Sequence, residues 1–170
     1  MQFRMKELLT KGQTETIHKQ LNISELFRGR QDVIGVGPLH IQLTIKPEAD
    51  IVTVEGNLEI DMELACSRCL ESTNSHLSIP FAEQFKPVAK YSESEEEAED
   101  DIIEIAGDVL DLQTFVEEYV LLSMPFIPLC KEECKGLCPQ CGTDLNVNQC
   151  QCSNERIDPR LASLKDFFKE

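Results

Sequence analysis

The chain has 170 residues, of which 41% are hydrophobic, enough for one compact domain with a core. There is no Trp and there are only two Tyr, so we expect that core to be largely aliphatic. The net charge of −15 disfavours direct nucleic-acid binding, because such binding depends on Lys and Arg side chains that neutralise phosphates. This charge favours a basic protein as the partner.

The N-terminal sequence and the overall hydropathy favour a cytoplasmic protein. The stretch MQFRMKELLTKGQ lacks the apolar region of a secretory signal, and no segment approaches the roughly 20 apolar residues of a membrane span. In a reducing compartment, clustered cysteines bind metal or act in catalysis more often than they form disulfides. Four disulfides in an exported protein are the alternative.

Residues 1–90 are predicted to form an antiparallel β-rich domain. A short strand is expected near Thr16–Ile23, and Ser24 is expected to cap a brief helix that ends at Phe27. Three longer stretches then alternate hydrophobic and polar residues, which is the pattern of half-buried strands. These stretches are Leu39–Ile45, Val52–Cys66 and Leu77–Phe81, with a turn near Pro47–Asp50 between the first two.

Residues 91–101, YSESEEEAEDD, contain seven acids and are predicted to form an acidic disordered loop. Residues 102–170 should then pack with residues 1–90 as one unit. They begin with a short strand at Ile102–Ile105 and a helix that Asp111 caps and Pro125 ends. A cysteine-rich segment and a terminal helix with an apolar stripe complete them; the stripe consists of Leu161, Leu164 and Phe168. The predicted fold class is α+β.

The eight cysteines predict two structural zinc sites. A structural zinc ion takes four tetrahedral ligands, and two cysteines separated by two residues can hold it from a single turn. The sequences CSRC and CPQC have this spacing, and CQC is a tighter variant. The predicted ligands are Cys66, Cys69, Cys130, Cys134, Cys138, Cys141, Cys150 and Cys152.

Spacing favours one partition of these ligands but leaves a second open. In the first, the four cysteines between residues 138 and 152 close on one ion locally, and the Cys66/Cys69 pair joins the pair at residues 130 and 134. The first set forms a zinc knuckle, and the second set staples the strand domain to the C-terminal segment. In the alternative partition, Cys66 and Cys69 join the cysteines at residues 138 and 141 instead.

The residues around the thiols argue against catalysis. Zinc hydrolysis and deamination need an open coordination position and a general base. The deaminase pattern H-x-E is absent, because the residues two positions after His18, His40 and His76 are Gln, Gln and Ser. A thiol oxidoreductase would need one reactive CxxC pair rather than eight thiols in complementary clusters, and it is the weaker alternative.

Several motifs together resemble the YceD family, the large ribosomal RNA subunit accumulation proteins. They are CSRCL, the acidic ESEEEAEDD, DLQTFVEEYVLLSMPFIPLC, CKGLCPQCGTDLN and DPRLASLKDF, which together span most of the chain. The resemblance implies a non-enzymatic, cytosolic factor needed for accumulation of the large-subunit (23S) ribosomal RNA and for large-subunit assembly. It also implies that Cys66 and Cys69 are the more general feature and that the Cys138–Cys152 site is an accessory. It implies no catalytic residue.

Two mechanisms of binding are compatible with this function. In the first, the acidic surface binds a basic ribosomal protein or an assembly intermediate before that protein meets RNA. In the second, the protein contacts RNA directly through Arg28 and Arg30 or through Lys131 and Lys135. The net charge favours the first mechanism.

Overall fold

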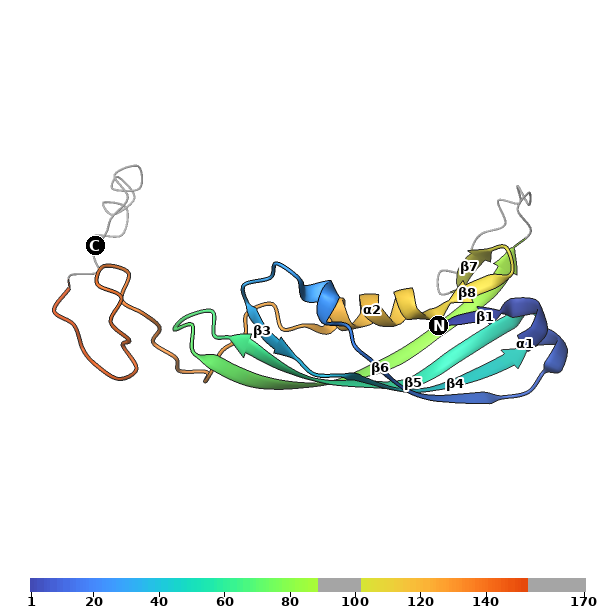
Figure 1. Ribbon diagram of the computed structural model, residues 1–170, viewed down its shortest axis with the longest axis horizontal. Coiled ribbons are helices and arrows are strands. Elements are labelled where there is room, and N and C mark those ends of the chain that lie inside the picture. The colour runs from blue at the N-terminus through green and yellow to red at the C-terminus, as the bar shows by residue number, and fades with distance from the viewer. Residues whose placement is uncertain (89–101, 153–170) are drawn as a thin grey trace, which may run out of the picture.

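The computed structural model describes residues 1–88 and 102–152, and a long curved sheet dominates it (Figure 1). The helices α1 and α2 and the short 3-10 helix η1 pack on one face of this sheet. The elements in chain order are β1 (Gln2–Arg4), α1 (Met5–Lys11), β2 (Glu15–Leu21), η1 (Ser24–Phe27), β3 (Val33–Val36), β4 (Leu39–Glu48), β5 (Ile51–Ala65), β6 (Ser72–Val88), β7 (Ile102–Ala106), β8 (Val109–Asp111) and α2 (Leu112–Ser123).

The strand order of the main sheet is β2-β4-β5-β6-β7, and β3 pairs with β5 beyond the end of β4. Neighbouring strands are antiparallel except β6 and β7, which run parallel. Strands β1 and β8 form a separate antiparallel pair, with Gln2 opposite Asp111. The predicted α+β fold with an antiparallel β-rich N-terminal part is confirmed.

The alternation of hydrophobic and polar residues decides which face of the sheet is buried. On the longest antiparallel pairing, β5 with β6, the side chains that face the helices belong to a single core. The opposite face of β5 carries Glu55, Asn57, Glu59, Asp61 and Glu63 and has no helix over it among the described residues. The buried residues of β4 and β5 are Leu39, Ile41, Leu43, Ile45, Val52, Val54, Leu58, Ile60, Met62 and Leu64.

Gly56 allows β4 and β5 to approach closely in the middle of the sheet. A Cβ atom at this position would overlap the backbone carbonyl oxygen of Gln42 on β4. Any other residue would therefore push the two strands apart.

Helix α2 packs its apolar residues into the core, as their helical spacing predicts, and it does so over β6. Its N-cap, Asp111, accepts a hydrogen bond from the backbone N–H of Gln113 at 3.1 Å. Leu112, Val116 and Val120 are buried. Two aromatic pairs join the helix to β6: the ring centroids of Phe81 and Tyr119 are 4.6 Å apart, and those of Phe85 and Phe115 are 5.0 Å apart.

The structure differs from the sequence-based expectation in several short elements. Elements β1, α1, β3 and β8 were not predicted. The brief helix at Ser24–Phe27 is present, but Ser24 is not its cap: Ile23 occupies that position, and the Ser24 hydroxyl donates to the side chain of Asn22. The predicted acidic disordered loop at 91–101 and the predicted terminal helix fall on residues outside the described ranges.

Candidate metal centres

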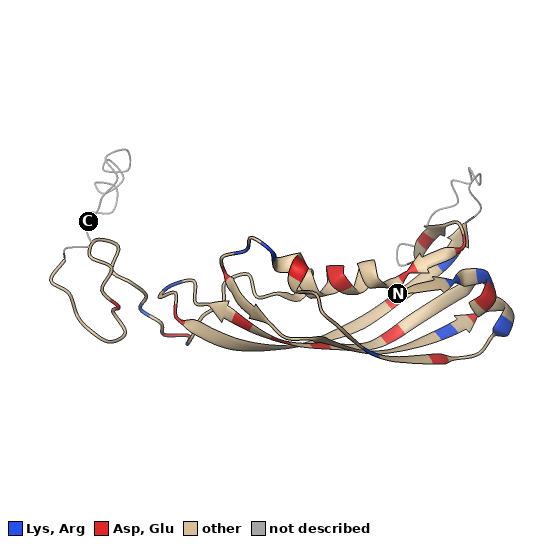
Figure 2. Cartoon of the chain, viewed as in Figure 1, with Lys and Arg blue, Asp and Glu red and all other residues tan. Residues whose placement is uncertain are grey.

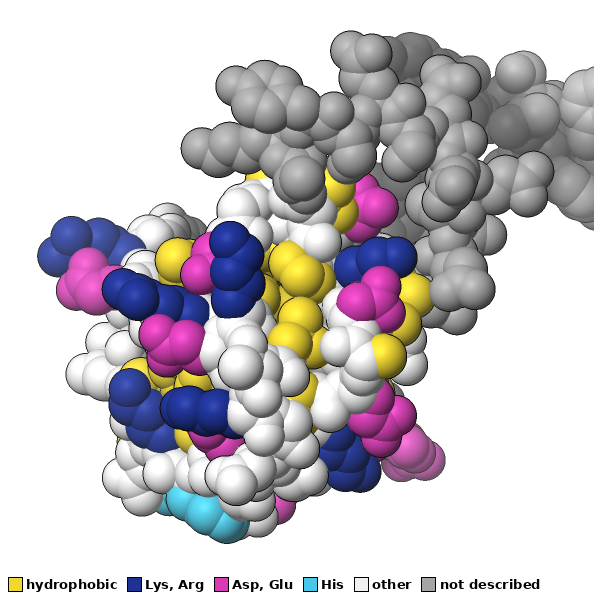
Figure 3. All heavy atoms as spheres, turned by 90° about the vertical axis from the view of Figure 1, so that its right-hand side faces the viewer, with side chains coloured by type: hydrophobic (Ala, Val, Ile, Leu, Met, Phe, Trp, Pro, Cys, Tyr) yellow, Lys and Arg dark blue, Asp and Glu magenta, His cyan; other side chains and the backbone are white. Residues whose placement is uncertain are grey.

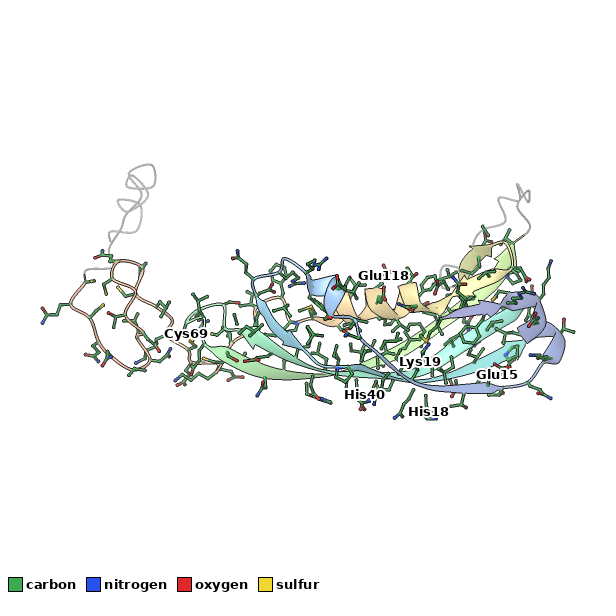
Figure 4. All side chains as sticks on the ribbon, in the orientation of Figure 1. Glu15, His18, Lys19, His40, Cys69 and Glu118 are labelled. Atoms are coloured by element: carbon green, nitrogen blue, oxygen red, sulfur yellow. The ribbon has the colours of Figure 1, made fainter. Side chains whose placement is uncertain are left out.

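Four cysteines from two distant parts of the chain meet at the end of the sheet. We call this cluster centre 1; it consists of Cys66, Cys69, Cys130 and Cys134, whose Sγ atoms all lie within 4.8 Å of one another. Cys66 directly follows β5, and Cys130 follows the loop after α2. Figure 4 shows Cys69 at this end of the sheet, where the cysteine-rich segment begins.

The distances in centre 1 fit a tetrahedral zinc ion. Zn–S bonds of about 2.3 Å place tetrahedral sulfur atoms about 3.8 Å apart. The Sγ atoms of Cys66 and Cys134 are 3.8 Å apart, and those of Cys69 and Cys130 are 3.6 Å apart. Cys66, Cys69 and Cys134 are buried, so a cation held here would be shielded from solvent.

Backbone N–H groups favour the thiolate form of Cys66. Burial raises the pKa of this thiol, but the backbone N–H groups of Cys130, Cys69 and Arg68 outweigh burial and lower the pKa to about 6. The turn that aims these groups is closed by a hydrogen bond from the Leu70 N–H to the Cys66 carbonyl at 2.9 Å. Centre 1 therefore contains a preformed site for negative charge.

The other ligands of centre 1 show why a cation would complete it. Burial raises the pKa of Cys134, but the Asn146 side chain, whose Nδ2 lies 3.4 Å from Sγ, and the Gly136 N–H lower it overall. In contrast, burial and the neighbouring thiols raise the pKa of Cys130 to about 12. Four thiolates repel one another, and a divalent cation at their centre offsets this repulsion by binding all four and halving their total charge.

Arg68 ties the cysteine-rich segment to the turn after β5. Its Nη1 donates to the Cys134 carbonyl at 2.7 Å, and its own carbonyl accepts from the Leu137 N–H at 3.0 Å. Gly136 packs against it with a φ of +74°, and a Cβ atom on Gly136 would lie only 2.8 Å from the Arg68 carbonyl oxygen. The Ser67 N–H donates to the Pro128 carbonyl at 2.8 Å, which fixes the chain on the other side of the turn.

The remaining four cysteines form a second, more exposed cluster. We call it centre 2; its Sγ atoms also lie within 4.8 Å of one another, and it consists of Cys138, Cys141, Cys150 and Cys152. Only Cys138 is buried, and Cys141 is exposed. Hydrogen bonds from the Thr143 side chain and backbone lower the pKa of Cys141 to about 6, whereas the Cys141 thiol and burial raise that of Cys152 to about 12.

The structure thus brings the eight thiols together in the first of the two partitions. Cys66 and Cys69 lie with the cysteines at 130 and 134, not with those at 138 and 141. In the parts of the chain that the structure describes, each cluster contains thiols alone, without a His or carboxylate ligand. Sequence reasoning missed Arg68 and Asn146, although both belong to the cysteine motifs.

Acidic and basic side chains are distributed unevenly over the rest of the described surface. Figure 2 shows acidic residues along the sheet and α2. At the end that carries α1, Figure 3 shows basic side chains interspersed with acidic ones. There Arg4 pairs with Glu7 at 3.3 Å, and Lys86 pairs with Asp50 at 3.3 Å. None of the described helices is long and apolar enough to cross a membrane.

The model of the YceD family, described as "Large ribosomal RNA subunit accumulation protein YceD", matches residues 54–168. Three of the proteins that are similar to this chain come from bacteria. An uncharacterized protein of Mycobacterium tuberculosis is 30% identical over 156 residues, which cover 91% of this chain and 72% of the relative. An uncharacterized protein of Mycobacterium leprae is 29% identical over 132 residues, 77% of this chain and 59% of the relative. The third is the large ribosomal RNA subunit accumulation protein YceD of Haemophilus influenzae, with 29% identity over 90 residues, 49% of this chain and 48% of the relative.

The chain therefore spans 59% of the length of the Mycobacterium leprae relative and about half of that of the Haemophilus influenzae relative. No solved structure matches the chain. The family model covers more than half of the chain, including all eight cysteines that form the two centres. The chain belongs to the YceD family of large ribosomal RNA subunit accumulation proteins.

Proposed function

We propose that this protein is a non-enzymatic, cytoplasmic factor that supports accumulation of 23S ribosomal RNA by binding a basic ribosomal protein or a large-subunit assembly intermediate. The family and the name of the Haemophilus influenzae relative support the link to large-subunit RNA. The observation that carries the choice of partner is the pairing of charges. The described residues contain 20 Asp and Glu against 11 Lys and Arg. Five of these cations pair with an acid, which leaves most of the described acids without a Lys or Arg partner, including the exposed Glu59 and Glu118.

Two structural zinc ions, one in each centre, are part of this proposal. Zinc bound by four thiolates has no open position for substrate, so it would supply only a cross-link between chain segments. In centre 1 that link joins the end of β5 to the segment after α2, and in centre 2 it closes a local knuckle. Residues 1–90 and 102–170 act as one unit. The core that Phe81 and Phe85 share with Leu112 and Val116 supports this.

The test is co-purification with large-subunit ribosomal proteins. The tagged, metal-loaded protein is incubated with these proteins after they have been freed of RNA. We expect one or more basic proteins to bind, the complex to survive RNase and to weaken as salt rises. Binding of bare ribosomal RNA at physiological salt, without any protein partner, would contradict the proposal.

Direct RNA contact is the second candidate mechanism. Arg28 and Arg30 would be its N-terminal contacts, but Arg28 pairs with Glu25 at 3.3 Å and Arg30 pairs with Asp32 at 2.5 Å. The exposed Lys131 and Lys135 could supply contacts from the cysteine-rich segment. Reversing the charges of Arg28 and Arg30 should abolish function only under this mechanism. A thiol oxidoreductase, the third candidate, would be isolated without metal and would reduce a model disulfide.

A further inference from the structure

Half of the large hydrophobic residues that the described surface exposes lie in one short segment. These four residues are named the α2 patch: Leu121, Leu122, Phe126 and Ile127, with 39%, 76%, 98% and 60% of their surface exposed. They lie on the last turn of α2 and on the loop that leads to centre 1. An aromatic side chain with nearly all of its surface in water is unfavourable unless something binds it.

The loop that carries the α2 patch is held in place on both sides. Met124, which ends α2, accepts a hydrogen bond from Arg30 through its Sδ at 3.6 Å. Pro128 accepts one from the Ser67 N–H at 2.8 Å, next to centre 1. Pro125 and Pro128 each have a fixed φ, which further restricts the loop. Phe126 is therefore presented in a preorganised loop, which reduces the entropy lost when a partner binds.

The net charge next to the α2 patch is negative, because Arg30, which contacts Met124, is neutralised by its ion pair with Asp32. Helix α2 contains Glu117 and Glu118 and has no Lys or Arg. Glu118 lies one turn before Leu122, on the same side of the helix, and Figure 4 shows it on the side of α2 that faces away from the sheet. The C-terminal end of a helix also carries partial negative charge. A ligand that covers the patch therefore meets negative potential as well as apolar surface.

We propose that the α2 patch binds a cationic, amphipathic segment of a protein, with an apolar side chain against Phe126 and Leu122 and a Lys or Arg at Glu118. The proposal rests on the proposed function and names the surface and the chemistry of its partner. A second copy of this chain fits poorly, because a symmetric contact would bring the acidic α2 helices together. RNA also fits poorly, because its phosphates would face carboxylates and a helix C-terminus.

The first experiment uses synthetic helical peptides and the full-length, zinc-loaded protein. The probe peptide has a Leu face and a Lys face. One control peptide replaces Leu by Ser, and the other replaces Lys by Glu. Fluorescence anisotropy should show that only the peptide with both faces binds. Equal binding of the Ser-substituted peptide would show that charge alone acts and would overturn the inference.

Variants then locate the binding surface. Phe126→Ser should weaken binding of the Leu/Lys peptide by about tenfold or more, as truncation of an interface anchor does. Val147→Ser, which changes an exposed hydrophobic residue outside the α2 patch with 75% of its surface exposed, should leave it unchanged. Glu118→Lys should weaken binding several-fold, and Glu59→Lys on the open sheet face should not. The side chains changed in these variants, Phe126, Val147, Glu118 and Glu59, are all exposed. Thermal unfolding should therefore show that each variant remains folded.

The second experiment separates failure of the surface from failure of the function. Wild type, Phe126→Ser and Val147→Ser are each incubated with RNA-free large-subunit ribosomal proteins. Loss of binding in Phe126→Ser alone supports the inference. If Phe126→Ser binds these proteins as well as wild type does, the inference is wrong and the proposed function stands. If wild type binds none of them, both are wrong.

Two other results would overturn the inference by naming a different occupant. The first is a wild-type dimer in sedimentation that Phe126→Ser dissociates, which would assign the patch to a second copy. The second is binding of a large-subunit RNA fragment that Phe126→Ser abolishes, which would assign it to RNA.

Discussion

The Sγ atoms of Cys66 and Cys134 lie 3.8 Å apart, although 68 positions separate the two residues in the chain. Cys66 follows β5, a 15-residue strand that crosses the core, whereas Cys134 belongs to the segment after α2. A cation between them would restrict the unfolded chain over this whole separation, because closing a long loop removes more conformational freedom than closing a short one. The two centres should therefore contribute differently to stability.

Native mass spectrometry should show two zinc ions per chain. Each centre holds four thiols within 4.8 Å of one another, close enough to bind a single tetrahedral ion, so we expect one ion per centre. Prolonged exposure to a chelator should remove the ion of the exposed centre 2 before that of the buried centre 1. Freshly purified protein that is folded and free of metal would contradict both centres.

Cys66→Ser should destabilise the entire fold. It leaves centre 1 with three thiols and removes the link between β5 and the segment after α2, so we expect a loss of several kcal/mol in the free energy of unfolding. Thermal unfolding and hydrogen exchange over β5 and β6 measure this loss.

Cys150→Ser is the matched variant in centre 2. Because the ligands of that centre lie close together in sequence, increased hydrogen exchange should be confined to residues 138–152 and the unfolding temperature of the sheet should change little. An equal, global loss from both variants would show that the two centres are not independent.

Gly136→Ala should destabilise the protein more than Gly142→Ala does. Both glycines have positive φ values, +74° and +71°, which cost an alanine about 1 kcal/mol. Only at Gly136 would the added Cβ also meet a backbone atom, the Arg68 carbonyl oxygen at 2.8 Å. We expect a total loss of about 3 kcal/mol for Gly136→Ala. Equal losses in chemical denaturation would show that the contact between Gly136 and Arg68 is unimportant.

Asp111→Ala should lower stability at neutral pH by about 1 kcal/mol through loss of the helix cap. The hydrogen bond from the Gln2 side chain is the main cause that lowers the pKa of Asp111. Burial opposes this effect, and the terminal ammonium and the Gln113 N–H reinforce it. A carboxyl group with a lowered folded pKa stabilises the fold above its unfolded value of about 3.9 and loses that contribution as the pH falls through the folded value.

The difference in unfolding free energy between wild type and Asp111→Ala should therefore shrink as the pH is lowered below about 4. Asp111→Asn is the control, because Asn caps helices well but does not titrate in this range. It should keep most of the stability at neutral pH and differ from Asp111→Ala by an amount that does not change with pH. A wild-type-to-Ala difference that is constant down to pH 2 would contradict the assignment.

The long strands and α2 could be predicted because their hydrophobic residues recur with a clear period. The period is two residues in the strands and about 3.6 residues in the helix. Leu39–Ile45 and Val52–Cys66 each place hydrophobic residues on one face, and the structure buries that face. The three-residue strands β1 and β8 carry no such pattern and form only because Gln2 meets Asp111 across the fold. Helix α1 was missed because it is short and its N-cap, Arg4, makes no side-chain capping bond.

The thiols of the two centres could be predicted from local spacing, but their partition could not be decided in the same way. The Cys66/Cys69 pair has the same CxxC spacing as the pair at 138 and 141, so either partition satisfies the ligand rule. The deciding contacts come from Arg68, which bonds to the Cys134 carbonyl and to the Leu137 N–H. These contacts depend on tertiary structure, so the sequence pattern carries no sign of them.

The late position of the residues that complete centre 1 has a consequence for biosynthesis. A nascent chain grows from its N-terminus, so β5 and the two thiols that follow it, Cys66 and Cys69, leave the ribosome well before Cys130 and Cys134 exist. Strand β1 likewise has no partner until β8 has been translated. The emerging polypeptide must therefore carry unmatched sulfur ligands and an unpaired strand edge through most of its own synthesis.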